Sequence, residues 1–308
     1  MSILPDGGFP LRFPGAIPAV TTPFDPTGAV DLDGLVRNAR SLLDAGMTGL
    51  VGNGTMGEAG SLSAGERRVV LEALVEAADG QATVTAGVSA QTPRDAAAHA
   101  REAAAAGAGA LMLLPPLLYG GDERELIAFY TAVARATQLP IMAYNNPVAS
   151  GGTDMLPPFV LRLAREVDAV VAVKECSGDA RRIAELLHGS DGELEVLVGG
   201  DDWALEGFSA GATGWISGVA NVAPVQCAAL LRHCQAGELD EARSLYARLL
   251  PLGRLDMTPK LVQYFKGAMD AVGLQGGPCR PPRLALTEEE QEVLEAALRA
   301  LGPVEVRV

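Results

Sequence analysis

The sequence predicts a (β/α)₈ barrel that carries a C-terminal helical extension. Three observations support this prediction: eight short apolar runs rich in β-branched residues, seven stretches of helical periodicity between them, and a glycine at several helix-to-strand joints. The barrel is expected over residues 1–237 and the extension over residues 238–308. A doubly wound open sheet is the rival architecture, and the count of eight strands favours the barrel.

Eight apolar runs are the strand candidates. In chain order they are PAVTTPF (18–24), TGLVGNG (48–54), ATVTAGV (82–88), GALMLLPP (109–116), LPIMAYNN (139–146), VVAVKEC (170–176), LEVLVGG (194–200) and TGWISG (213–218). Their apolar residues fall on both faces of each strand and helical stretches separate them, which is typical of a parallel sheet covered by helices.

The stretches between the strands have the start and stop signals of helices. Helical periodicity is clear at 33–45, 64–78 and 93–106. Thr92 before Pro93, and Ser63 three residues before Glu66, are predicted helix starts. At the joints DAGMTGLV, AAGAGALM and SAGATGWI, the first glycine is expected to end a helix in the left-handed conformation before the next strand begins.

Composition excludes several classes of protein. With 48% hydrophobic and 20% charged residues the chain is globular, and its net charge of −14 disfavours nucleic acid and anionic membranes as partners. The first residues lack the pattern of a signal peptide, and the run ALMLLPPLLY is too short to span a bilayer, so a cytoplasmic location is expected. Free thiols are therefore expected at Cys176, Cys227, Cys234 and Cys279, and no metal-ligand spacing is found.

Lys174 is unusual for its position, because it ends an apolar run in VVAVKECSGD (170–179). The chain has three lysines, Lys174, Lys260 and Lys266, and arginine supplies every other basic side chain. Arginine keeps its proton in proteins, whereas a desolvated lysine has a lowered pKa and its neutral amine forms Schiff bases with ketones. We therefore expect a nucleophilic amine, with a structural ion pair to Glu175 or Asp179 as the alternative.

The C-terminal ends of barrel strands carry the chemistry of such folds. The residues at these ends are Thr21, Thr22, Asn53, Gly54, Thr55, Gly87, Pro115, Tyr144, Asn145, Lys174, Glu175, Gly200, Asp201 and Ser217. Tyr144 ends the strand that precedes the strand of Lys174. It is a candidate for proton transfer, and a barrel-filling aromatic with a satisfied hydroxyl is the alternative.

GNGTMGE (52–58) is a glycine-rich loop after the second strand. It matches G-x-G-x-x-G, which raises a nicotinamide cofactor and a reductase as one hypothesis. Several residues separate Gly57 from the next helix, however, and the following strand ends without an acidic residue to hold a ribose. A loop whose backbone N–H groups bind an anion such as a carboxylate fits better, with a purely structural turn as the alternative.

Taken in order, a set of segments resembles the dihydrodipicolinate synthase/N-acetylneuraminate lyase superfamily. They are GTMGE (54–58), YNNP (144–147), VKECSGD (173–179), GGDD (199–202), GWISGVANVAP (214–224) and CRPPRLALT (279–287). The resemblance covers nearly the whole chain. It implies a (β/α)₈ barrel, Schiff-base chemistry on pyruvate or another 2-oxo acid, no cofactor or metal, and commonly a homotetramer built as a dimer of dimers. The catalytic residues that it implies are the Schiff-base Lys174, the proton-transfer Tyr144, and Thr55.

The same resemblance assigns residues to the substrate. Thr55 and Met56 would hold the substrate carboxylate, chiefly through their backbone N–H groups, while Gly200 and Ile216 would line the pyruvyl part of the pocket. One departure falls in this set, because the family loop often has a second threonine where this chain has Met56. The hydroxyl at that place is lost.

Two further departures bear on the second substrate. The synthases place a tyrosine from a neighbouring subunit in the proton relay, where this chain has Leu117, with Tyr119 two residues further on. They also carry an arginine after the YNxP turn for the carboxylate of the aldehyde substrate, and Ala149 stands at that place here. Losing a charge-assisted contact of this kind costs about 1.5–3 kcal/mol, which is enough to change substrate preference.

The leading hypothesis from the sequence is a Schiff-base lyase, an aldolase or dehydratase acting on a hydroxylated 2-oxo acid. A synthase that condenses pyruvate with aspartate semialdehyde is one alternative. A non-catalytic protein that binds 2-oxo acids on the same barrel is another, because the three departures could leave binding without turnover.

Overall fold

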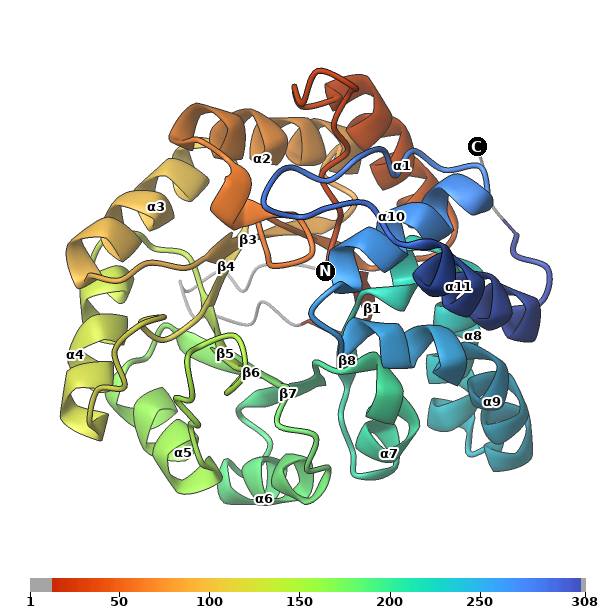
Figure 1. Cartoon of the computed structure of the whole chain (residues 1–308). Coiled ribbons are helices and arrows are strands. Elements are labelled where there is room, and N and C mark those ends of the chain that lie inside the picture. The colour runs from red at the N-terminus through yellow and green to blue at the C-terminus, as the bar shows by residue number, and fades with distance from the viewer. Residues whose placement is uncertain (1–12, 306–308) are drawn as a thin grey trace.

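The computed structural model describes residues 13–305, and this part of the chain forms a closed barrel of parallel strands surrounded by helices (Figure 1). The strands are β1 (Gly15–Pro18), β2 (Gly49–Gly52), β3 (Thr83–Val88), β4 (Ala110–Leu113), β5 (Ile141–Asn145), β6 (Val170–Glu175), β7 (Glu195–Val198) and β8 (Gly214–Ser217). The order is β1-β8-β7-β6-β5-β4-β3-β2, and a parallel bridge between Ala19 and Val51 joins the two ends of the sheet. The predicted (β/α)₈ barrel is confirmed.

Helices alternate with the strands and continue after the barrel. They are α1 (Leu32–Asp44), α2 (Ala64–Ala78), α3 (Pro93–Ala105), α4 (Glu123–Ala134), α5 (Pro157–Glu166), α6 (Arg181–Gly189), α7 (Ala204–Ser209), α8 (Pro224–Ala236), α9 (Leu239–Asp256), α10 (Leu261–Ala271) and α11 (Glu288–Leu301), with 3₁₀ turns η1 (Ala59–Ser61), η2 (Asp201–Trp203) and η3 (Val219–Asn221). Ser63 and Thr92 cap α2 and α3 as predicted, each accepting a hydrogen bond from a backbone N–H of the first turn. Among the described helices, none combines the length and the apolar character that crossing a membrane requires.

The first strand begins earlier than the sequence predicted, at Gly15 in place of residue 18. Its ladder with β8 runs from Gly15 to Pro18, and the chain then leaves the sheet. Thr22 turns its hydroxyl to the carbonyl of Gly57, at 2.8 Å, and Thr21 contacts the sulfur of Met269 at 3.2 Å. Both polar side chains are buried and hold the loop after β1 in place through these contacts. Neither of them lines the cavity described below.

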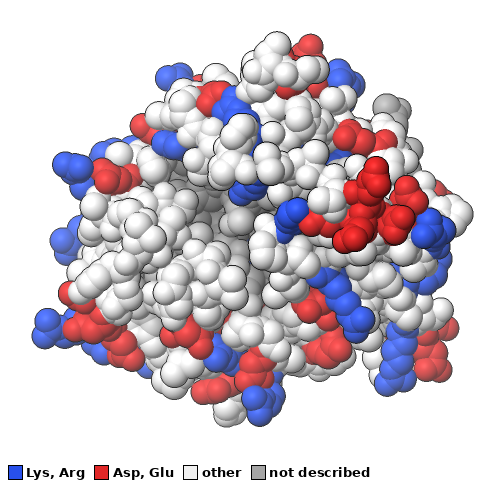
Figure 2. Space-filling view, in the orientation of Figure 1, with Lys and Arg blue, Asp and Glu red and all other residues white. Residues whose placement is uncertain are grey.

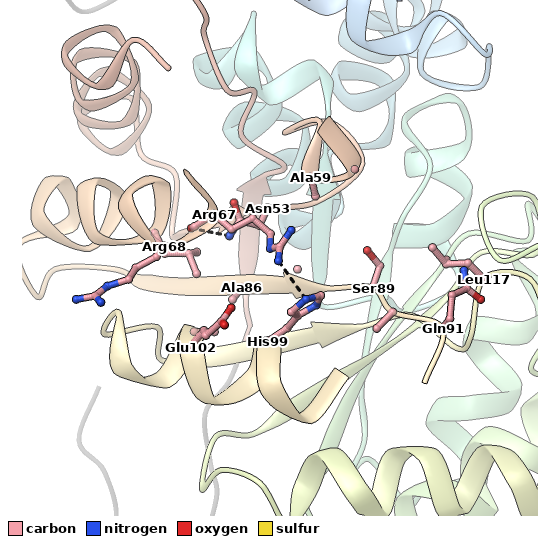
Figure 3. Close-up of a pocket in the computed structure, with 15 residues that line it drawn as sticks. Asn53, Ala59, Arg67, Arg68, Ala86, Ser89, Gln91, His99, Glu102 and Leu117 are labelled. Atoms are coloured by element: carbon pink, nitrogen blue, oxygen red, sulfur yellow. Dashed lines mark hydrogen bonds between the residues drawn. The ribbon is translucent and has the colours of Figure 1, made fainter. Parts of the chain in front are cut away.

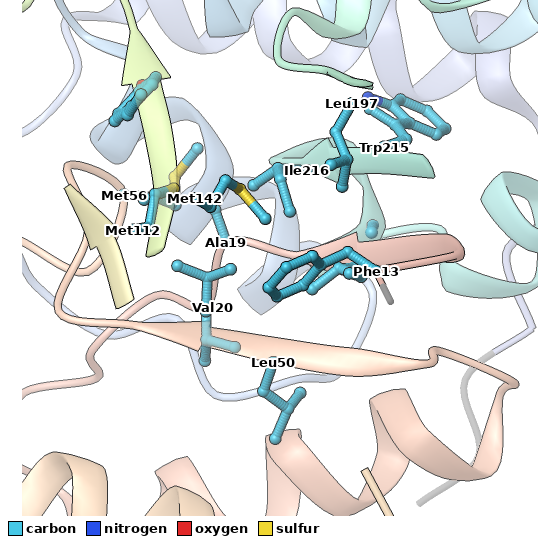
Figure 4. Close-up of a cluster of buried hydrophobic side chains, with 14 of the residues drawn as sticks. Phe13, Ala19, Val20, Leu50, Met56, Met112, Met142, Leu197, Trp215 and Ile216 are labelled. Carbon is cyan, nitrogen blue, oxygen red and sulfur yellow. The ribbon is translucent and has the colours of Figure 1, made fainter. Parts of the chain in front are cut away.

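Packing inside the barrel is apolar and close. Figure 4 shows Met112, Met142, Leu197 and Ile216, from β4, β5, β7 and β8, in one cluster of buried side chains. At the three predicted joints the glycines have positive φ angles, between 89° and 106°, which is the left-handed conformation expected where each helix ends. Local glycine chemistry therefore sets where each helix ends and the next strand enters the barrel.

The C-terminal helices are tied to the barrel by a buried ion pair. Lys266 on α10 lies 2.7 Å from Glu58 in the loop after β2, and both side chains are almost completely buried. The Lys266 ammonium also donates to the carbonyl of Pro278 at 2.8 Å and lies 4.3 Å from the ring centroid of Phe24. Helix α10 therefore holds the end of the glycine-rich loop. Whether residues 238–308 make a separate domain stays a prediction.

Lys266→Met is expected to lower the free energy of unfolding by up to about 3–5 kcal/mol, because it leaves the buried Glu58 with only the longer contact to Arg283, at 3.6 Å, as its counter-charge. Denaturant unfolding followed by circular dichroism measures this loss. The matched control is Lys260→Met, which removes the partly exposed ion pair with Glu290 and should cost no more than about 1 kcal/mol. Adding Glu58→Gln to Lys266→Met should restore part of the loss, and equal losses in the two single lysine variants would contradict the buried-pair explanation.

Candidate active site

Tyr144 and Lys174 lie side by side at the C-terminal ends of β5 and β6, where the two residues are directly paired in the sheet. They open into a cavity of about 340 Å³ at the end of the barrel. In Figure 2 the centre of this face is hollowed, with few charged side chains around the hollow. The lining residues are Ala19, Gly54, Thr55, Met56, Met112, Tyr144, Asn146, Val148, Ala149, Lys174, Cys176, Gly199, Ile216, Gly218, Asp256, Met257, Thr258, Pro259 and Leu261.

The amine of Lys174 is directed at Tyr144. Its Nζ atom lies 4.2 Å from the centroid of the tyrosine ring, and Asn146 donates from its side-chain amide to the Tyr144 hydroxyl at 2.9 Å. Glu175 and Asp179, the two carboxylates that could have made Lys174 structural, are bound elsewhere. Glu175 accepts from the backbone of Ser177 and from Asn145, and Asp179 pairs with Arg181.

Around Lys174, groups act on its pKa in opposite directions. Burial lowers the pKa of Lys174, while Tyr144, Cys176 and Asp256 raise it when they are ionised, and the balance lies above the usual value. Burial raises the pKa of Tyr144 and brings the pKa of Cys176 to about 12, so both groups are neutral near neutral pH. Burial therefore acts in the expected direction on the Lys174 pKa, and the neighbouring groups act against it. Because Tyr144 and Cys176 are neutral at that pH, Asp256 is the neighbour whose charge opposes the effect of burial on the Lys174 pKa, and the amine must give up any proton it carries before it attacks a carbonyl.

Asp256 is the acidic group of this cavity. Burial raises its pKa to about 6, against the nearby positive charge of Lys174, which lowers it. Near neutral pH most Asp256 carboxyls are therefore ionised, and Asp256 is the member of the set around Lys174 that carries negative charge. The cavity thus holds one basic and one acidic side chain among the residues that line it.

Beside Lys174, the wall of the cavity is Gly199, one residue before the Gly200 expected from the sequence. A Cβ atom at Gly199 would overlap the sulfur of Cys176 and lie 2.8 Å from Cε of Lys174, so only glycine leaves room for both side chains. Gly200 faces the other way, because a Cβ atom there would meet the indole of Trp203. Ile216, the other residue expected at the pyruvyl part, does line the cavity.

The glycine-rich loop brings Thr55 and Met56 to the cavity. Within the described residues, the backbone N–H groups of Thr55 and Met56 donate no hydrogen bond to the protein. The Thr55 side chain is exposed, whereas Met56 is 3% exposed and directs its methyl group at Gly218. Two unpaired N–H groups beside a lysine amine suit a carboxylate ligand.

The residues at the two departures that bear on the second substrate are placed differently from one another. Ala149 lines the cavity, so the arginine position faces the substrate space with a methyl group. Tyr119 is 58% exposed and its hydroxyl donates to Glu125 at 3.0 Å. Leu117 lines a second cavity, between α2, α3 and β3, where Arg67 contacts His99 at 3.1 Å (Figure 3). Neither Leu117 nor Tyr119 reaches the cavity of Lys174 within this chain.

Sequence reasoning missed several lining residues. Asn146 and Cys176 are the last residues of two predicted strands, each two positions after Tyr144 or Lys174, and this spacing could have indicated them. The segment 256–261 between α9 and α10 gave no such signal. Its local sequence, a helix end followed by Thr-Pro, does not show that the segment lines the cavity. The described residues contain no group of three or more histidine, cysteine or acidic side chains placed to hold a metal ion.

Comparison with known proteins gives a consistent result. The model of the dihydrodipicolinate synthetase family matches residues 12–301. A 4-hydroxy-tetrahydrodipicolinate synthase of Methanothrix thermoacetophila is 36% identical over 94% of this chain and 97% of its own length. A DapA-like lyase of Halobacterium salinarum is 33% identical over 97% of each chain. The structure of the 4-hydroxy-tetrahydrodipicolinate synthase of Methylacidiphilum fumariolicum SolV superposes with a TM-score of 0.90, at 29% identity over 94% of this chain and 96% of that one.

Proposed function

Because the chain belongs to the dihydrodipicolinate synthetase family, and is a lyase of that family, we propose that Lys174 is its Schiff-base lysine and that pyruvate is the first substrate. The observation that carries this proposal is the pairing of Lys174 with Tyr144 at the ends of adjacent strands, inside a cavity that also presents the unpaired backbone N–H groups of Thr55 and Met56. The loop would hold the carboxylate of pyruvate and direct its ketone carbon at the amine.

Tyr144 would move the protons that this reaction requires. The ammonium of Lys174 first loses a proton, and the neutral amine then forms a bond to the ketone carbon to give a carbinolamine. The carbinolamine hydroxyl leaves as water after it gains a proton, and an iminium remains. The ring centroid of Tyr144 lies 4.2 Å from Lys174 Nζ, and Asn146 holds its hydroxyl. This phenol can relay a proton by giving its own to the substrate oxygen while it receives one from the nitrogen. The iminium then withdraws electrons from the next carbon, which loses a proton and becomes a nucleophile.

The relatives support an aldehyde as the second substrate. Those named 4-hydroxy-tetrahydrodipicolinate synthase match 94–96% of this chain, so condensation of the pyruvate enamine with aspartate semialdehyde is the first reaction to assign to it. The new carbon–carbon bond would form between the enamine carbon and the aldehyde carbon, and water would then release the product from Lys174.

A second reaction is favoured by the side chains that differ. Ala149 gives the cavity no cation for the carboxylate of an aldehyde substrate, and neither Leu117 nor Tyr119 completes a relay within this chain. The same iminium also serves an aldolase or a dehydratase that acts on a hydroxylated 2-oxo acid, by cleaving a carbon–carbon bond or by eliminating water. For that reaction no second carboxylate has to be bound.

Borohydride trapping tests the Schiff base directly. Incubation with pyruvate and borohydride should add one reduced pyruvyl group to the intact protein, and peptide mapping should place it on Lys174. A substrate panel then separates the two reactions: consumption of pyruvate with aspartate semialdehyde supports the synthase, and release of pyruvate or of a new semialdehyde from hydroxylated 2-oxo acids supports the lyase. An intact mass that pyruvate and borohydride leave unchanged would refute the proposal.

The assembly belongs to the same proposal. A homotetramer in the cytoplasm is what the family resemblance implies, and Leu118, Tyr119 and Val148 are exposed on the loops beside the cavity. Apolar side chains exposed together favour contact with another protein surface. Light scattering of the purified protein measures the mass of the assembly.

A further inference from the structure

Asp256 brings a carboxyl group to the cavity from outside the barrel strands. It is the last residue of α9, and the segment 256–261 that follows from it supplies five of the lining residues. Figure 1 shows α9 and α10 beside the β8 end of the barrel. Part of the substrate space is therefore shaped by the C-terminal helices and not by the strand ends alone.

Beneath Asp256 lies a second carboxyl group, that of Asp201, and the two have different surroundings. A Cβ atom at Gly218 would lie 3.1 Å from Oδ2 of Asp201 and 3.1 Å from Oδ1 of Asp256, so both carboxyl groups approach the same point. Asp201 is 2% exposed, and its Oδ2 accepts from the backbone N–H groups of Gly218 and Val219 at 3.0 and 2.8 Å. Asp201 is thus fixed to the protein, while Asp256 borders the cavity.

Once pyruvate is attached, Asp256 has no charged partner left among the lining side chains of the described residues, and the backbone N–H of Asp201 is the protein donor that acts on its carboxyl group. Lys174 would then be an iminium that is bonded to the substrate, and the backbone of Thr55 and Met56 would hold the first carboxylate. Among the remaining lining residues of the described chain, Asp256 alone carries a charge. A second carboxylate placed next to it would be repelled, whereas a hydroxyl or an ammonium would donate to it.

We propose that Asp256 is a specificity-determining residue, which accepts a hydrogen bond from a hydroxyl or ammonium group on the part of the substrate beyond the 2-oxo acid head. This inference rests on the proposed function, because it takes Lys174 as the point of attachment. Both candidate reactions offer such a donor: the ammonium of aspartate semialdehyde in the synthase, and a chain hydroxyl in the aldolase or dehydratase. The chemistry of the donor then distinguishes the two.

The experiment compares Asp256→Asn and Asp256→Leu with wild type on three compounds: aspartate semialdehyde with pyruvate, a 4-hydroxy-2-oxo acid, and a further hydroxylated homologue of that acid. An ammonium bound by Asp256 predicts that both variants lose roughly 10- to 100-fold in kcat/KM with aspartate semialdehyde. A bound hydroxyl predicts that asparagine, which can still accept a hydrogen bond, retains more activity on the hydroxylated acids than leucine does. Equal activity of wild type and both variants on every compound that is turned over would overturn the inference.

Two controls keep the result interpretable. Asp202→Asn removes a neighbouring carboxyl that does not line the cavity, so a similar loss there would point to the general charge of this region and against Asp256 as a ligand. A wild-type pH profile needs no variant: kcat/KM for an ammonium-bearing substrate should fall as pH drops through about 6, where Asp256 gains its proton in the presence of Lys174, Asp201 and Asp202. A flat profile through this range would contradict ammonium binding.

Trapping separates this inference from the proposed function. If wild type gives no borohydride adduct with pyruvate, the proposed function fails and the inference loses its basis. If trapping is normal and the Asp256 variants match wild type in kcat/KM, only the inference fails. Melting temperatures of the variants show whether each one is folded, and Asp256→Glu, which keeps the carboxyl, replaces any variant that is not.

Discussion

Lys174→Ala is expected to abolish adduct formation with pyruvate and to lower kcat by roughly 10⁴- to 10⁶-fold, because no other lining residue carries an amine that could form the iminium. Steady-state turnover and borohydride trapping measure the two effects. The fold should persist, since alanine fits the space of a larger side chain and the ion pairs around position 174 do not include Lys174. Circular dichroism of the variant checks this.

A matched control is available on the same chain. Lys260→Ala removes another lysine, which precedes α10 and pairs with Glu290 on α11. Lys260 does not line the cavity. The variant should keep the adduct that pyruvate forms with wild type. If Lys174→Ala still forms an adduct of the same mass, the Schiff base is on another amine and the assignment of Lys174 is wrong.

Tyr144→Phe should lower turnover by about 10²- to 10⁴-fold, the range that general acid–base catalysis supplies. The substitution keeps the ring that packs against Lys174 and removes only the hydroxyl that Asn146 binds. The variant should therefore remain folded, and trapping of pyruvate should become slower, because forming the carbinolamine and expelling water both require a proton carrier. Single-turnover trapping rates measure this step separately from product release.

Tyr119→Phe is the control for the relay. The hydroxyl of Tyr119 donates to the exposed Glu125, away from the cavity of Lys174, so its loss should change the trapping rate of the single chain by less than about threefold. A loss comparable to that of Tyr144→Phe would mean that Tyr119 enters the proton relay, through a neighbouring subunit or a rearranged loop. That result would also strengthen the assignment of the aldehyde reaction to this site.

The sequence by itself determined the architecture and the identity of the central pair. Apolar runs between helical stretches predicted the strands, and because the C-terminal ends of parallel strands meet at one end of a barrel, Tyr144 and Lys174 could be expected to be neighbours. The helix ends at the joint glycines and the helix starts at Ser63 and Thr92 could also be predicted from the sequence. These signals are local, because each residue acts on the backbone within a few positions of itself.

Only the tertiary structure decided the details of the cavity. The choice between Gly199 and Gly200 depends on which way each residue faces, and one residue of offset along a strand reverses the face. The start of β1 depends on its register with β8, almost 200 residues away in the chain. The local pattern of apolar residues predicts neither the direction that each glycine faces nor the register of β1 with β8.

The pKa of Lys174 and the presence of Asp256 have the same origin. Burial could be anticipated from the apolar run before Lys174, and it favours a lowered pKa, whereas the groups that act against it when ionised are Tyr144, Cys176 and Asp256. Asp256 is 82 positions further along the chain than Lys174. It reaches the cavity at the end of α9, which the sequence predicted only as part of the C-terminal helical extension. Electrostatic effects depend on distances in space, and the sequence alone gives those distances only where a fold rule fixes them, as it does for adjacent strand ends.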